Sequence, residues 1–407
     1  MKKKVVGMVL NSFYPHDIRV KKEAETLMRE GYKVCLLCYK RWEENRFEII
    51  DGIHIQRVYI GENKVLEGFW DTINAITFYH PLVGIAMKKF IDDFDINILH
   101  IHDLPLAGTA IRIGKKKNMK IILDLHENYP EALRVWFSWR KSSLIQLKNR
   151  LFFNYNRWLK FENYAVFKSD YIIAVVDEMK DRLIKDHHLS SKKITVVTNT
   201  EKTSYVHQKI DKNIYENIVD KFIILYAGNI GPHRGIDTVI NSMKYLSKYK
   251  NIYFVIVGSA SSDVMMNLEN IAIENGVSNN VIFKGYQPFH TFYSYMSQAS
   301  VNVIPHKKNG HTDHTIPHKI FQAMMVGKPV LVSTCKPLKR VVERYNSGEI
   351  FEAGNPIDCA SKIMSIYRNS VHAKKMGKNG IRATLNGDAN WENTGNKLVS
   401  LYKKAEK

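Results

Sequence analysis

Short apolar runs alternate with helical segments along almost the whole chain, and this alternation most restricts the possible fold. One series of runs ends before residue 200, and a second begins after residue 220. The runs are Val5–Leu10, Lys33–Cys38, Ile96–His100, Lys120–Leu125, Tyr171–Val175, Ile194–Val197, Phe222–Ala227, Tyr253–Val257, Val281–Phe283, Val301–Ile304 and Val330–Val332. Intervening segments such as Val20–Glu30, Ile236–Leu246 and His290–Gln298 have helical periodicity. This α/β pattern predicts parallel sheets covered by helices on both faces, with ligands at the carboxyl ends of the strands.

The length of the chain and one polar stretch indicate two domains. A chain of 407 residues is too long for a single hydrophobic core and suits two domains of roughly 200 residues each. The stretch 201–220 is polar and lacks a clear period, so we interpret it as a linker. We therefore expect one domain at 1–200 and a second at 221–388. Two such domains are expected to form a ligand cleft between them.

Composition restricts the environment of the protein. No apolar run reaches the roughly 18 residues that a membrane helix needs. The basic start followed by Val5–Leu10 imitates a signal peptide, but it is short and has no small-residue cleavage site, so a buried strand explains it better. Four cysteines do not make a disulfide framework in a chain of this size, and Cys35 and Cys38 lie in an apolar strand pattern. We expect a cytoplasmic protein with reduced cysteines, these two in the core.

The positive charge of the chain predicts acidic partners. The formal net charge is +20, and residues 134–168 alone carry eight Lys/Arg against the single Glu162. One helical stripe in this segment is apolar and is expected to face the core: Leu144, Leu147, Leu151, Tyr155 and Trp158. A second face mixes basic and aromatic residues: Phe153, Arg157, Lys160, Phe161, Tyr164 and Lys168. This second face suits an anionic lipid surface, and it equally suits a solvated helix face that covers other protein.

The segment 315–326 is predicted to be a helix that begins at an anion site. Thr315 or Ile316 would cap this helix, and Pro317 would stand in its first turn, where its missing N–H costs nothing. Unpaired N–H groups at a helix N-terminus attract anions. A lysine is unfavourable at that position unless an anion is bound, so Lys319 indicates a phosphate or diphosphate.

A glycine-rich loop offers a second cation for the same anion. Residues 226–237 are predicted to form a strand, a loop with three glycines that include Gly231, and the start of a helix. Arg234 in this loop can hold phosphate oxygens with two donors. The glycine spacing matches neither the dinucleotide fingerprint nor the P-loop. The loop therefore indicates a phosphate site mainly because its Arg234 and Lys319 could bind the same diphosphate.

Two more strand ends in the second half carry glycine turns. Gly258 follows one apolar run, and Gly285 with Tyr286 follows the next. Backbone groups in these turns could hold a base and a ribose, and each could equally be an ordinary turn.

Several histidines crowd together before the predicted helix and raise the question of a metal: His306, His311, His314 and His318. His314 and His318 have a spacing that can ligate zinc on a helix. The neighbouring loop is basic, and Asp313 is the only carboxylate close by in the sequence. We expect no metal there.

Ordered motifs over nearly the whole chain resemble the retaining glycosyltransferases of family four, which have the GT-B architecture of two facing Rossmann-like domains. In the second half these motifs are Gly228-Asn229-Ile230 through Arg234-Gly235, Phe283–Tyr286, Ala299–Pro305 and Gln322–Val330. In the first half they are His16–Val20, Leu99–Asp103 and Asp124–Glu127. Trp391-Glu392 resembles the closing helix of the family, so 389–407 is expected to be a helix that packs back on the N-terminal domain.

The resemblance implies a nucleotide diphosphate sugar in the second domain and an acceptor in the first. Arg234 and Lys319 would stabilise the leaving diphosphate in place of a metal, so neither a metal nor another cofactor is expected. The remaining donor-binding residues would be Asn229, Gly231, Gly258, Gly285, Tyr286, His314, Thr315, Ile316, Pro317 and Gln322. His126 would reach toward the reacting sugar, unless local backbone satisfies its ring. The acceptor side would hold Arg19, His102, Asp103 and Glu127, and either of the two carboxylates could take the acceptor proton.

Four positions depart from the family pattern. His314 and Gln322 stand where the family has paired glutamates, and in the glycine-rich loop Asn229 replaces an arginine and Arg234 a lysine, so one cation is lost there. Gln322 can still hydrogen-bond ribose hydroxyls, whereas His314 exchanges a charged acceptor for a group that donates or accepts. We expect the donor to differ from that of common members.

The predicted function is transfer of a sugar from a nucleotide diphosphate sugar to a saccharide acceptor with retention at the anomeric carbon. The basic aromatic face favours a lipid-linked acceptor, peripheral attachment to an anionic membrane on its inner face, and a role in cell-envelope polysaccharide or glycolipid assembly. We expect no nucleic-acid partner. Two alternatives are a nucleotide-sugar epimerase or hydrolase of the same fold, and a non-enzymatic basic protein that binds nucleic acid or a membrane.

Overall fold

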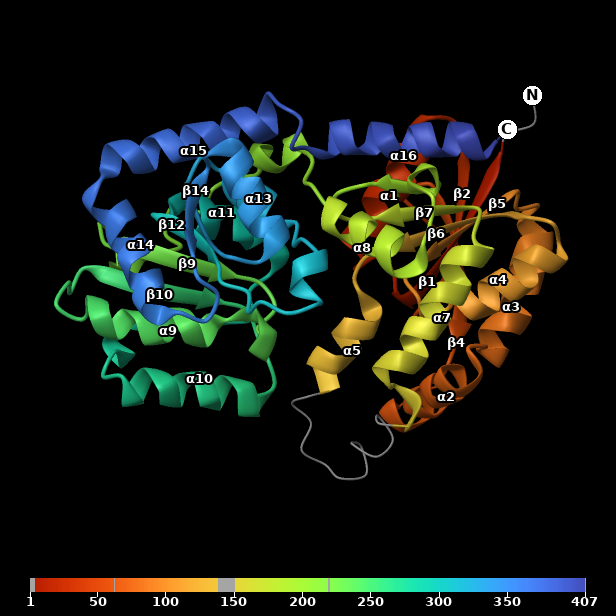
Figure 1. The fold of residues 1–407 in the computed structure, drawn as a ribbon, viewed down its shortest axis with the longest axis horizontal. Helices are drawn as coiled ribbons and strands as arrows, with labels where there is room; N and C mark the ends of the chain where they lie inside the picture. The colour runs from red at the N-terminus through yellow and green to blue at the C-terminus, as the bar shows by residue number, and fades with distance from the viewer. Residues whose placement is uncertain (1–3, 62, 138–150, 219, 407) are drawn as a thin grey trace. The chain divides into compact units, whose positions relative to one another are not determined.

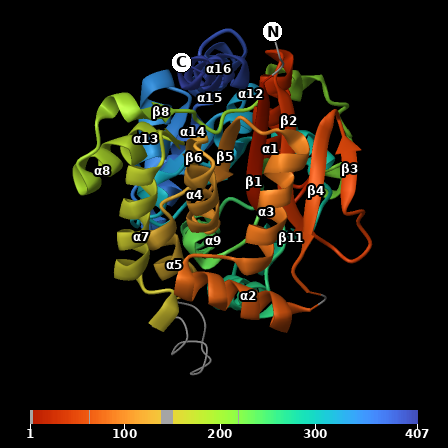
Figure 2. The same ribbon diagram turned by 90° about the vertical axis from the view of Figure 1, so that its right-hand side faces the viewer.

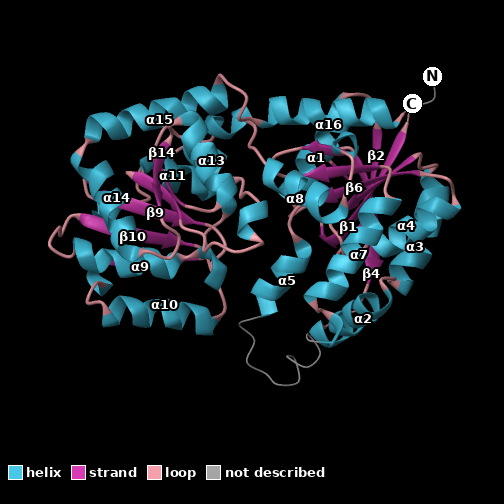
Figure 3. Ribbon diagram, viewed as in Figure 1, coloured by secondary structure: helices cyan, strands magenta, loops and turns pink. Residues whose placement is uncertain are grey.

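The computed structural model describes residues 4–61, 63–137, 151–218 and 220–406. The chain divides into two compact units, one formed by 1–198 with 395–407 and the other by 199–394. Each unit contains its own sheet, with helices on both sides (Figures 1 and 3). The α/β prediction is therefore confirmed for both halves of the chain.

The first unit is built on an eight-stranded sheet in the order β3-β4-β2-β1-β5-β6-β7-β8 (Figure 2). Its strands are β1 (Val5–Phe13), β2 (Lys33–Lys40), β3 (Phe47–Ile50), β4 (Ile53–Tyr59), β5 (Ile98–His102), β6 (Lys120–Leu125), β7 (Tyr171–Ala174) and β8 (Ile194–Val196). Among the strand pairs of the described residues in this unit, only β3–β4 is antiparallel. Strand order reverses between β1 and β5, and ligands of parallel sheets bind at such switch points.

Helices connect the parallel strands of the first unit. They are α1 (Ile18–Arg29), α2 (Lys64–Thr77), α3 (Pro81–Phe94), α4 (Ala107–Lys116), α5 (Tyr129–Phe137), α7 (Tyr155–Lys168) and α8 (Asp177–His187). Asp17 caps α1, Asn63 caps α2 and Asn154 caps α7, each by accepting hydrogen bonds from N–H groups of the first turn. These caps explain why each helix begins where it does.

The second unit has a six-stranded sheet in the order β11-β10-β9-β12-β13-β14. Its strands are β9 (Phe222–Ala227), β10 (Ile252–Val257), β11 (Val281–Gly285), β12 (Val301–Ile304), β13 (Val330–Ser333) and β14 (Gly348–Phe351), and all pairs are parallel. Numbered from β9, this is the 3-2-1-4-5-6 order of dinucleotide-binding folds, so the switch point lies between β9 and β12. Fully buried side chains such as Tyr226 and Phe254 form the core beside these strands.

The helices of the second unit are α9 (Ile236–Met243), α10 (Ser262–Glu274), α11 (Phe292–Gln298), α12 (Lys319–Met325), α13 (Lys336–Tyr345), α14 (Pro356–Arg368) and α15 (Ser370–Leu385). A last helix, α16 (Trp391–Ala405), begins in the second unit, and its residues from Gly395 onward belong to the first. In the first unit, the Tyr402 hydroxyl lies 2.7 Å from His100 Nδ1. None of the helices in the described part of the chain is both long and apolar enough to cross a membrane.

Every apolar run predicted to be a strand overlaps a strand of the structure, but three strands escaped prediction. These are β3, β4 and β14. The sequence of β4 places Gln56 and Arg57 among its apolar residues, and both are buried. Arg57 is compensated by Glu44 and Glu48, whose oxygens lie 3.4 Å and 2.7 Å from its nitrogens. A buried polar residue with remote partners breaks the apolar pattern without breaking the strand.

The stretch 201–220, expected to be a linker, is packed in the second unit. It contains short 3₁₀ turns at Thr203–His207 and Glu216–Ile218. Tyr205 and Tyr215 are buried, and their hydroxyls contact Met296 Sδ at 3.6 Å and the Tyr295 carbonyl at 3.0 Å. Aromatic anchors spaced along a polar stretch thus attach it to the core.

The start of the helix expected at 315–326 differs in the structure. α12 begins at Lys319 with His318 as its N-terminal cap, so Thr315, Ile316 and Pro317 precede the helix. The cause is local, because a residue that precedes proline is driven out of the helical region, and this applies to Ile316. Lys319 is still in the first turn. The four cysteines are free and buried, which confirms a core position for Cys35 and Cys38.

Candidate active site

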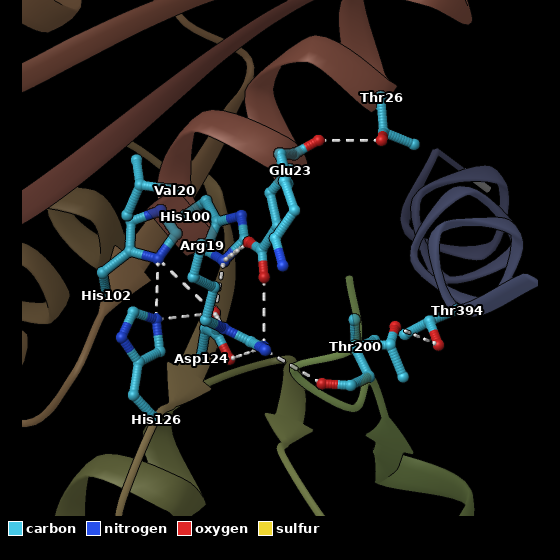
Figure 4. A network of polar contacts seen from close by, with 12 residues as sticks. Arg19, Val20, Glu23, Thr26, His100, His102, Asp124, His126, Thr200 and Thr394 are labelled. Carbon is cyan, nitrogen blue, oxygen red and sulfur yellow. Dashed lines mark hydrogen bonds and ion pairs between the residues drawn. The ribbon is translucent and has the colours of Figure 1, made fainter. Parts of the chain in front are cut away.

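The first candidate site lies in the first unit, at the carboxyl ends of β5 and β6 near the switch point (Figure 4). His102 ends β5, Asp124 is its register partner on β6, and His126 directly follows β6. Arg19 approaches from the first turn of α1. Parallel strands thus bring a carboxylate, two imidazoles and a guanidinium together from three separate segments.

Asp124 is the centre of this network. It is fully buried and accepts hydrogen bonds from Arg19 Nε at 3.1 Å and Nη2 at 2.9 Å. Arg19 also lies 3.0 Å from Glu23 and donates to the Val197 carbonyl at 3.0 Å. Burial raises the pKa of Asp124, but Arg19 and His126 outweigh it and hold that pKa well below its ordinary value. The carboxylate is therefore ionised and fully compensated.

His126 lies between two carboxylates. Its Nε2 is 2.9 Å from Asp124, its Nδ1 is 3.3 Å from Asp103, and its backbone N–H donates to Asp103 at 2.8 Å. Burial lowers the pKa of His126, but the two carboxylates outweigh it and raise that pKa to about 10. The ring is thus an imidazolium whose nitrogens both face carboxylates, and at neutral pH it does not act as a base.

Two of the four residues expected on the acceptor side are buried. Arg19 is 5% exposed and His102 is 0% exposed, so neither reaches an acceptor. His102 Nδ1 lies 3.2 Å from His126 Nε2, and burial lowers the pKa of His102 to about 3. Asp103 and Glu127 keep partial exposure. Of the four predicted acceptor-side residues, these two are therefore the ones with side chains open to solvent.

Four buried residues of this region offer ligand atoms within 4.8 Å of one another: Glu23, His100, His102 and Asp124. The guanidinium of Arg19 already stands 2.9 Å from the Asp124 carboxylate and 3.0 Å from Glu23, whose pKa burial raises to about 8. A divalent cation there would face this fixed positive charge, so the donor set does not fit a metal. The histidines at 306–318 do not appear as a metal group in the described part of the chain.

The second candidate site lies in the second unit, at the switch point between β9 and β12. The Lys319 ammonium is 4.5 Å from the centre of the Tyr226 ring and 3.5 Å from its hydroxyl. Gly228 has a φ of +136°, which favours glycine, and a Cβ added there would lie 2.1 Å from that ammonium. Burial, together with Arg234, lowers the pKa of Lys319 well below its ordinary value.

Arg234 has a neutral partner. Its Nη1 lies 3.1 Å from Nε2 of the buried His306, which follows β12. Burial, followed by the nearby cations, lowers the pKa of His306 well below its ordinary value, so its ring accepts the hydrogen bond in the neutral form. Neither Arg234 nor Lys319 forms an ion pair with a carboxylate of the described residues, whereas the neighbouring Lys307 lies 2.6 Å from Asp237. Two cations that lack a carboxylate partner and lie near the same switch point favour an anionic ligand.

The predicted glycine turns meet at the same edge of the sheet. Gly228 donates to the Val257 carbonyl at 2.9 Å, and Gly258 donates to the Gly285 carbonyl at 2.9 Å. Asn229 accepts from the Tyr226 hydroxyl at 2.5 Å through its backbone carbonyl. These contacts bring three loops together from separate strands.

The other predicted donor residues divide into accessible and buried ones. Tyr286 is 76% exposed, and His314 Nδ1 lies 2.7 Å from the Gly310 carbonyl. Thr315, Pro317 and Gly231 are partly exposed, whereas Ile316 is buried. Gln322 is completely buried and donates to Glu201 at 2.8 Å, so its amide nitrogen is already used within the protein.

Comparison with known proteins identifies the family of the chain. Residues 18–200 match the family model described as Glycosyltransferase Family 4, and residues 207–383 match the model for glycosyl transferases group 1. An uncharacterized glycosyltransferase of Methanocaldococcus jannaschii is 24% identical over 371 residues, covering 90% of each chain. The capsular polysaccharide biosynthesis glycosyltransferase CapM of Staphylococcus aureus is 25% identical over 252 residues, which is 59% of this chain and 63% of CapM.

This chain belongs to the glycosyltransferases of family four. Its fold is GT-B, as in the sucrose-phosphate synthase of Thermosynechococcus elongatus, to which it is 17% identical with a TM-score of 0.79 over 99% of both chains. The resemblance of the motifs to this family is thereby confirmed, and so is the prediction of a glycosyltransferase.

The basic aromatic face expected on α7 of this glycosyltransferase is partly occupied by internal contacts. Phe161 is buried and stacks on Phe78 with ring centres 3.9 Å apart. Arg157 donates to the carbonyls of Ala75 and Ile76 at the end of α2. These two residues are therefore not available to a lipid surface, because helix carbonyls and an aromatic ring already satisfy them.

The remaining residues of that face differ in exposure. Lys160, Tyr164 and Lys168 are exposed, whereas Phe153 is partly buried. In the stripe expected to face the core, Trp158 is buried but Leu151 is 56% exposed, while Leu144 and Leu147 lie outside the described residues.

Sequence reasoning missed several residues of the two sites. Asp124 was named only within a motif, although parallel neighbours place it beside His102, which is one of the predicted acceptor-side residues. Tyr226 under Lys319 and His306 beside Arg234 had no such signal, because their partners are 93 and 72 residues away. Glu201 beside Gln322 lies in the stretch that was assigned to the linker.

Proposed function

We propose that this glycosyltransferase transfers a sugar from a nucleotide diphosphate sugar to a saccharide acceptor, with retention at the anomeric carbon and without a metal. The second unit would hold the donor, with Lys319 and Arg234 at its diphosphate. The first unit would carry the acceptor, with Asp103 and Glu127 as the carboxylates nearest to its hydroxyls.

The observation that carries this proposal is the pair of uncompensated cations. Lys319 begins α12 and Arg234 lies in the loop after β9; both lie near the switch point of the sheet and have no carboxylate partner among the described residues. A glycine at 228 leaves room for the ammonium. A diphosphate would replace the missing counter-charge, and its charge grows as the bond to the anomeric carbon breaks.

His306 would orient Arg234 in this mechanism. As a neutral acceptor at 3.1 Å, it fixes one guanidinium nitrogen and leaves the others free to donate to phosphate oxygens. The Ser333 hydroxyl donates to the His306 carbonyl at 2.6 Å and fixes its backbone. Two preorganised cations would thus perform the charge stabilisation that a metal ion provides elsewhere, and removing one such donor typically costs about 3–4 kcal/mol in the transition state.

His126 would act through its neighbours rather than as a base. Held as an imidazolium between Asp124 and Asp103, it fixes the second carboxylate by two contacts, through its ring and its backbone N–H. Asp103 has a positive φ of 62°, which a side-chain and backbone clamp of this kind helps to maintain. His126 would therefore position Asp103 toward the acceptor.

The biological setting is proposed from the relatives. CapM is named for capsular polysaccharide biosynthesis, and a chain with a net charge of +20 is suited to anionic substrates. We therefore propose a role in cell-envelope polysaccharide or glycolipid assembly, with a lipid-linked acceptor and peripheral attachment to an anionic membrane. Exposed Lys160 and Lys168 remain as cations for such a surface.

The experiment compares three variants with a panel of nucleotide sugars and candidate acceptors. Lys319→Ala and Arg234→Ala are expected to lower sugar transfer by at least about a hundredfold. Lys307→Ala is the matched control, because Asp237 already neutralises that lysine. Full transfer by both Lys319→Ala and Arg234→Ala would contradict the diphosphate site.

Product analysis separates transfer from the alternative chemistry. A retaining transferase gives a glycoside with the anomeric configuration of the donor, which NMR of the purified product measures. An epimerase or hydrolase would instead convert the donor in the absence of any acceptor. Release of free sugar at the same rate with and without acceptor would favour that alternative.

A further inference from the structure

A pocket in the first unit lies apart from the histidine network described above. It has a volume of about 490 Å³ and opens at the carboxyl ends of β2 and β4, beside the first turns of α3. Lys40 and Tyr59 are register partners at the ends of these strands, and Trp42 follows on the next loop. The pocket therefore occupies the edge where parallel sheets bind ligands, on the opposite side of β1 from β5.

The walls of this pocket, which we call the Trp42 pocket, are mainly apolar and unusually exposed. Trp42 and Ile85 are each 69% exposed, and Tyr59 is 39% exposed. The rings of Trp42 and Tyr59 are 6.0 Å apart at an angle of 56°, so they form two sides of a concave surface. Large aromatic side chains left in water along a concavity indicate a ligand with apolar faces.

The cations of the Trp42 pocket show what charge that ligand carries. Arg57, one of the lining residues, is neutralised by Glu44 and Glu48. By contrast, Lys40 and Arg46 form no ion pair with a carboxylate in the part of the chain that the structure describes. Lys40 is held by two loop carbonyls at 3.2 Å and 3.0 Å, which leaves one ammonium hydrogen available. Two uncompensated cations beside apolar walls suit an anionic group on the ligand.

We propose that the Trp42 pocket binds a sugar residue of an acidic saccharide, one that bears carboxylate or phosphate groups. A pyranose ring has an apolar C–H face that packs on the indole and phenol rings, while its acidic substituent reaches Lys40 and Arg46. A lipid chain would also contact the apolar walls, but it carries no anionic group along its length that could pair with Lys40 and Arg46.

The position of the pocket fits a remote part of an acceptor. Strands β2 and β5 are separated only by β1, which is about 10 Å across two strand spacings. The loop after β2 is tied to the end of β1, since Arg41 lies 2.9 Å from His16 and 4.9 Å from the Phe13 ring. An acidic saccharide bound at Trp42 could therefore extend toward Asp103. This inference rests on the proposed function, in which the first unit carries the acceptor.

The test measures saccharide binding without any donor, by isothermal titration calorimetry. The probes are an alginate hexasaccharide, trehalose 6-phosphate and neutral maltohexaose. At least one anionic probe is expected to bind more tightly than maltohexaose, and Trp42→Ala is expected to weaken that binding by about tenfold or more. Arg46→Ala should reduce the preference for the anionic probe, whereas Lys116→Ala, an exposed cation on α4, should leave the affinity unchanged.

Several results would overturn the proposal. They are no binding of either anionic probe, equal binding of the neutral one, or unchanged affinity in both Trp42→Ala and Arg46→Ala. Tighter binding of dodecyl phosphate than of the saccharides would assign the pocket to a lipid instead. Because Trp42 and Arg46 are exposed, both variants are expected to fold, which circular dichroism checks. Binding of UDP, ADP and GDP is measured in parallel, so failure of the donor site is distinguished from failure of this pocket.

Discussion

Replacement of Lys319 by methionine should make the ligand-free protein more stable and the donor site weaker at the same time. The lysine is held against Gly228 and Tyr226 without a carboxylate, so its charge is disfavoured in the folded state. Methionine keeps the apolar length of the side chain and removes that charge. For a half-buried cation we expect a gain of about 1–2 kcal/mol in the free energy of unfolding. That gain corresponds to roughly 2–4 °C in Tm for each kcal/mol in a unit of this size.

The pH dependence of stability gives a second measure of the same effect. The folded pKa of Lys319 lies well below its ordinary value of 10.5, so the unfolded state binds more protons between those two values. Stability contributed by this group therefore rises with pH through that window, and it is lowest where the folded lysine is still protonated. The Lys319→Met variant should lack this rise. Chemical denaturation at several pH values measures the difference.

Binding of a nucleoside diphosphate to the wild type should stabilise the charged form of Lys319. The anion stabilises the ammonium, so the pKa of Lys319 rises and binding takes up protons, which calorimetry in buffers of different ionisation enthalpy detects. Loss of one charge-assisted contact in Lys319→Met should weaken the affinity by about 10- to 150-fold. Lys307→Met is the control and should keep the affinity. Unchanged affinity together with lower ligand-free stability in Lys319→Met would refute the reasoning.

Three further changes test buried contacts. Glu162→Gln removes the counter-charge that lies 2.7 Å from the buried Arg182 and should cost about 3–5 kcal/mol in urea unfolding at pH 7. The pKa of Glu162 is lowered to about 2 because Arg182 outweighs burial, so this contribution is complete above pH 4.5, lost as pH falls toward 2, and absent from the variant. Gln322→Glu would place a second carboxylate next to Glu201 in a buried site, so Tm should fall at pH 7 and partly recover at pH 5 as one carboxyl protonates. Gly258→Ala forces a Cβ to within 2.0 Å of a carbonyl oxygen at a φ of +144° and should lower Tm by at least about 4 °C, measured by thermal denaturation.

The strands could be predicted because their signal is local. Lys120–Leu125, Phe222–Ala227 and Val301–Ile304 have the same bounds in the sequence pattern and in the structure. Each is a continuous apolar run, as expected for a strand buried on both faces of a parallel sheet. β14 (Gly348–Phe351) escaped because it is short, begins with glycine and includes a glutamate, and its position is fixed by pairing with β13.

The individual site residues could be predicted only in part, because their chemistry depends on distant partners. His126 and Arg19 were assigned from motifs, but the ionisation of one and the burial of the other follow from Asp124, which is 105 residues from Arg19. The sequence predicts that Arg234 and Lys319 bind the same anion. It does not predict that His306 contacts Arg234 or that Tyr226 lies against Lys319. Motifs identify the residues near a site, whereas the partners decide which of them remain available to a ligand.

In both units, the cations that pair with carboxylates differ in role from those that do not. Paired cations stabilise the fold, whereas the others are available to bind a ligand. In the first unit, Arg19 and Arg57 are buried. Arg19 is paired with the Asp124 carboxylate and Arg57 with Glu44 and Glu48, so their charge is used to hold the fold. Lys40 ends β2, Arg234 lies in the loop after β9 and Lys319 begins α12, and none of the three has such neutralisation among the described residues. An unpaired cation costs stability in proportion to its burial, and a negatively charged ligand offsets that cost. Ligand-induced stabilisation should therefore be strongest for the most buried of these cations, and nucleoside diphosphates should raise Tm more than acidic saccharides do.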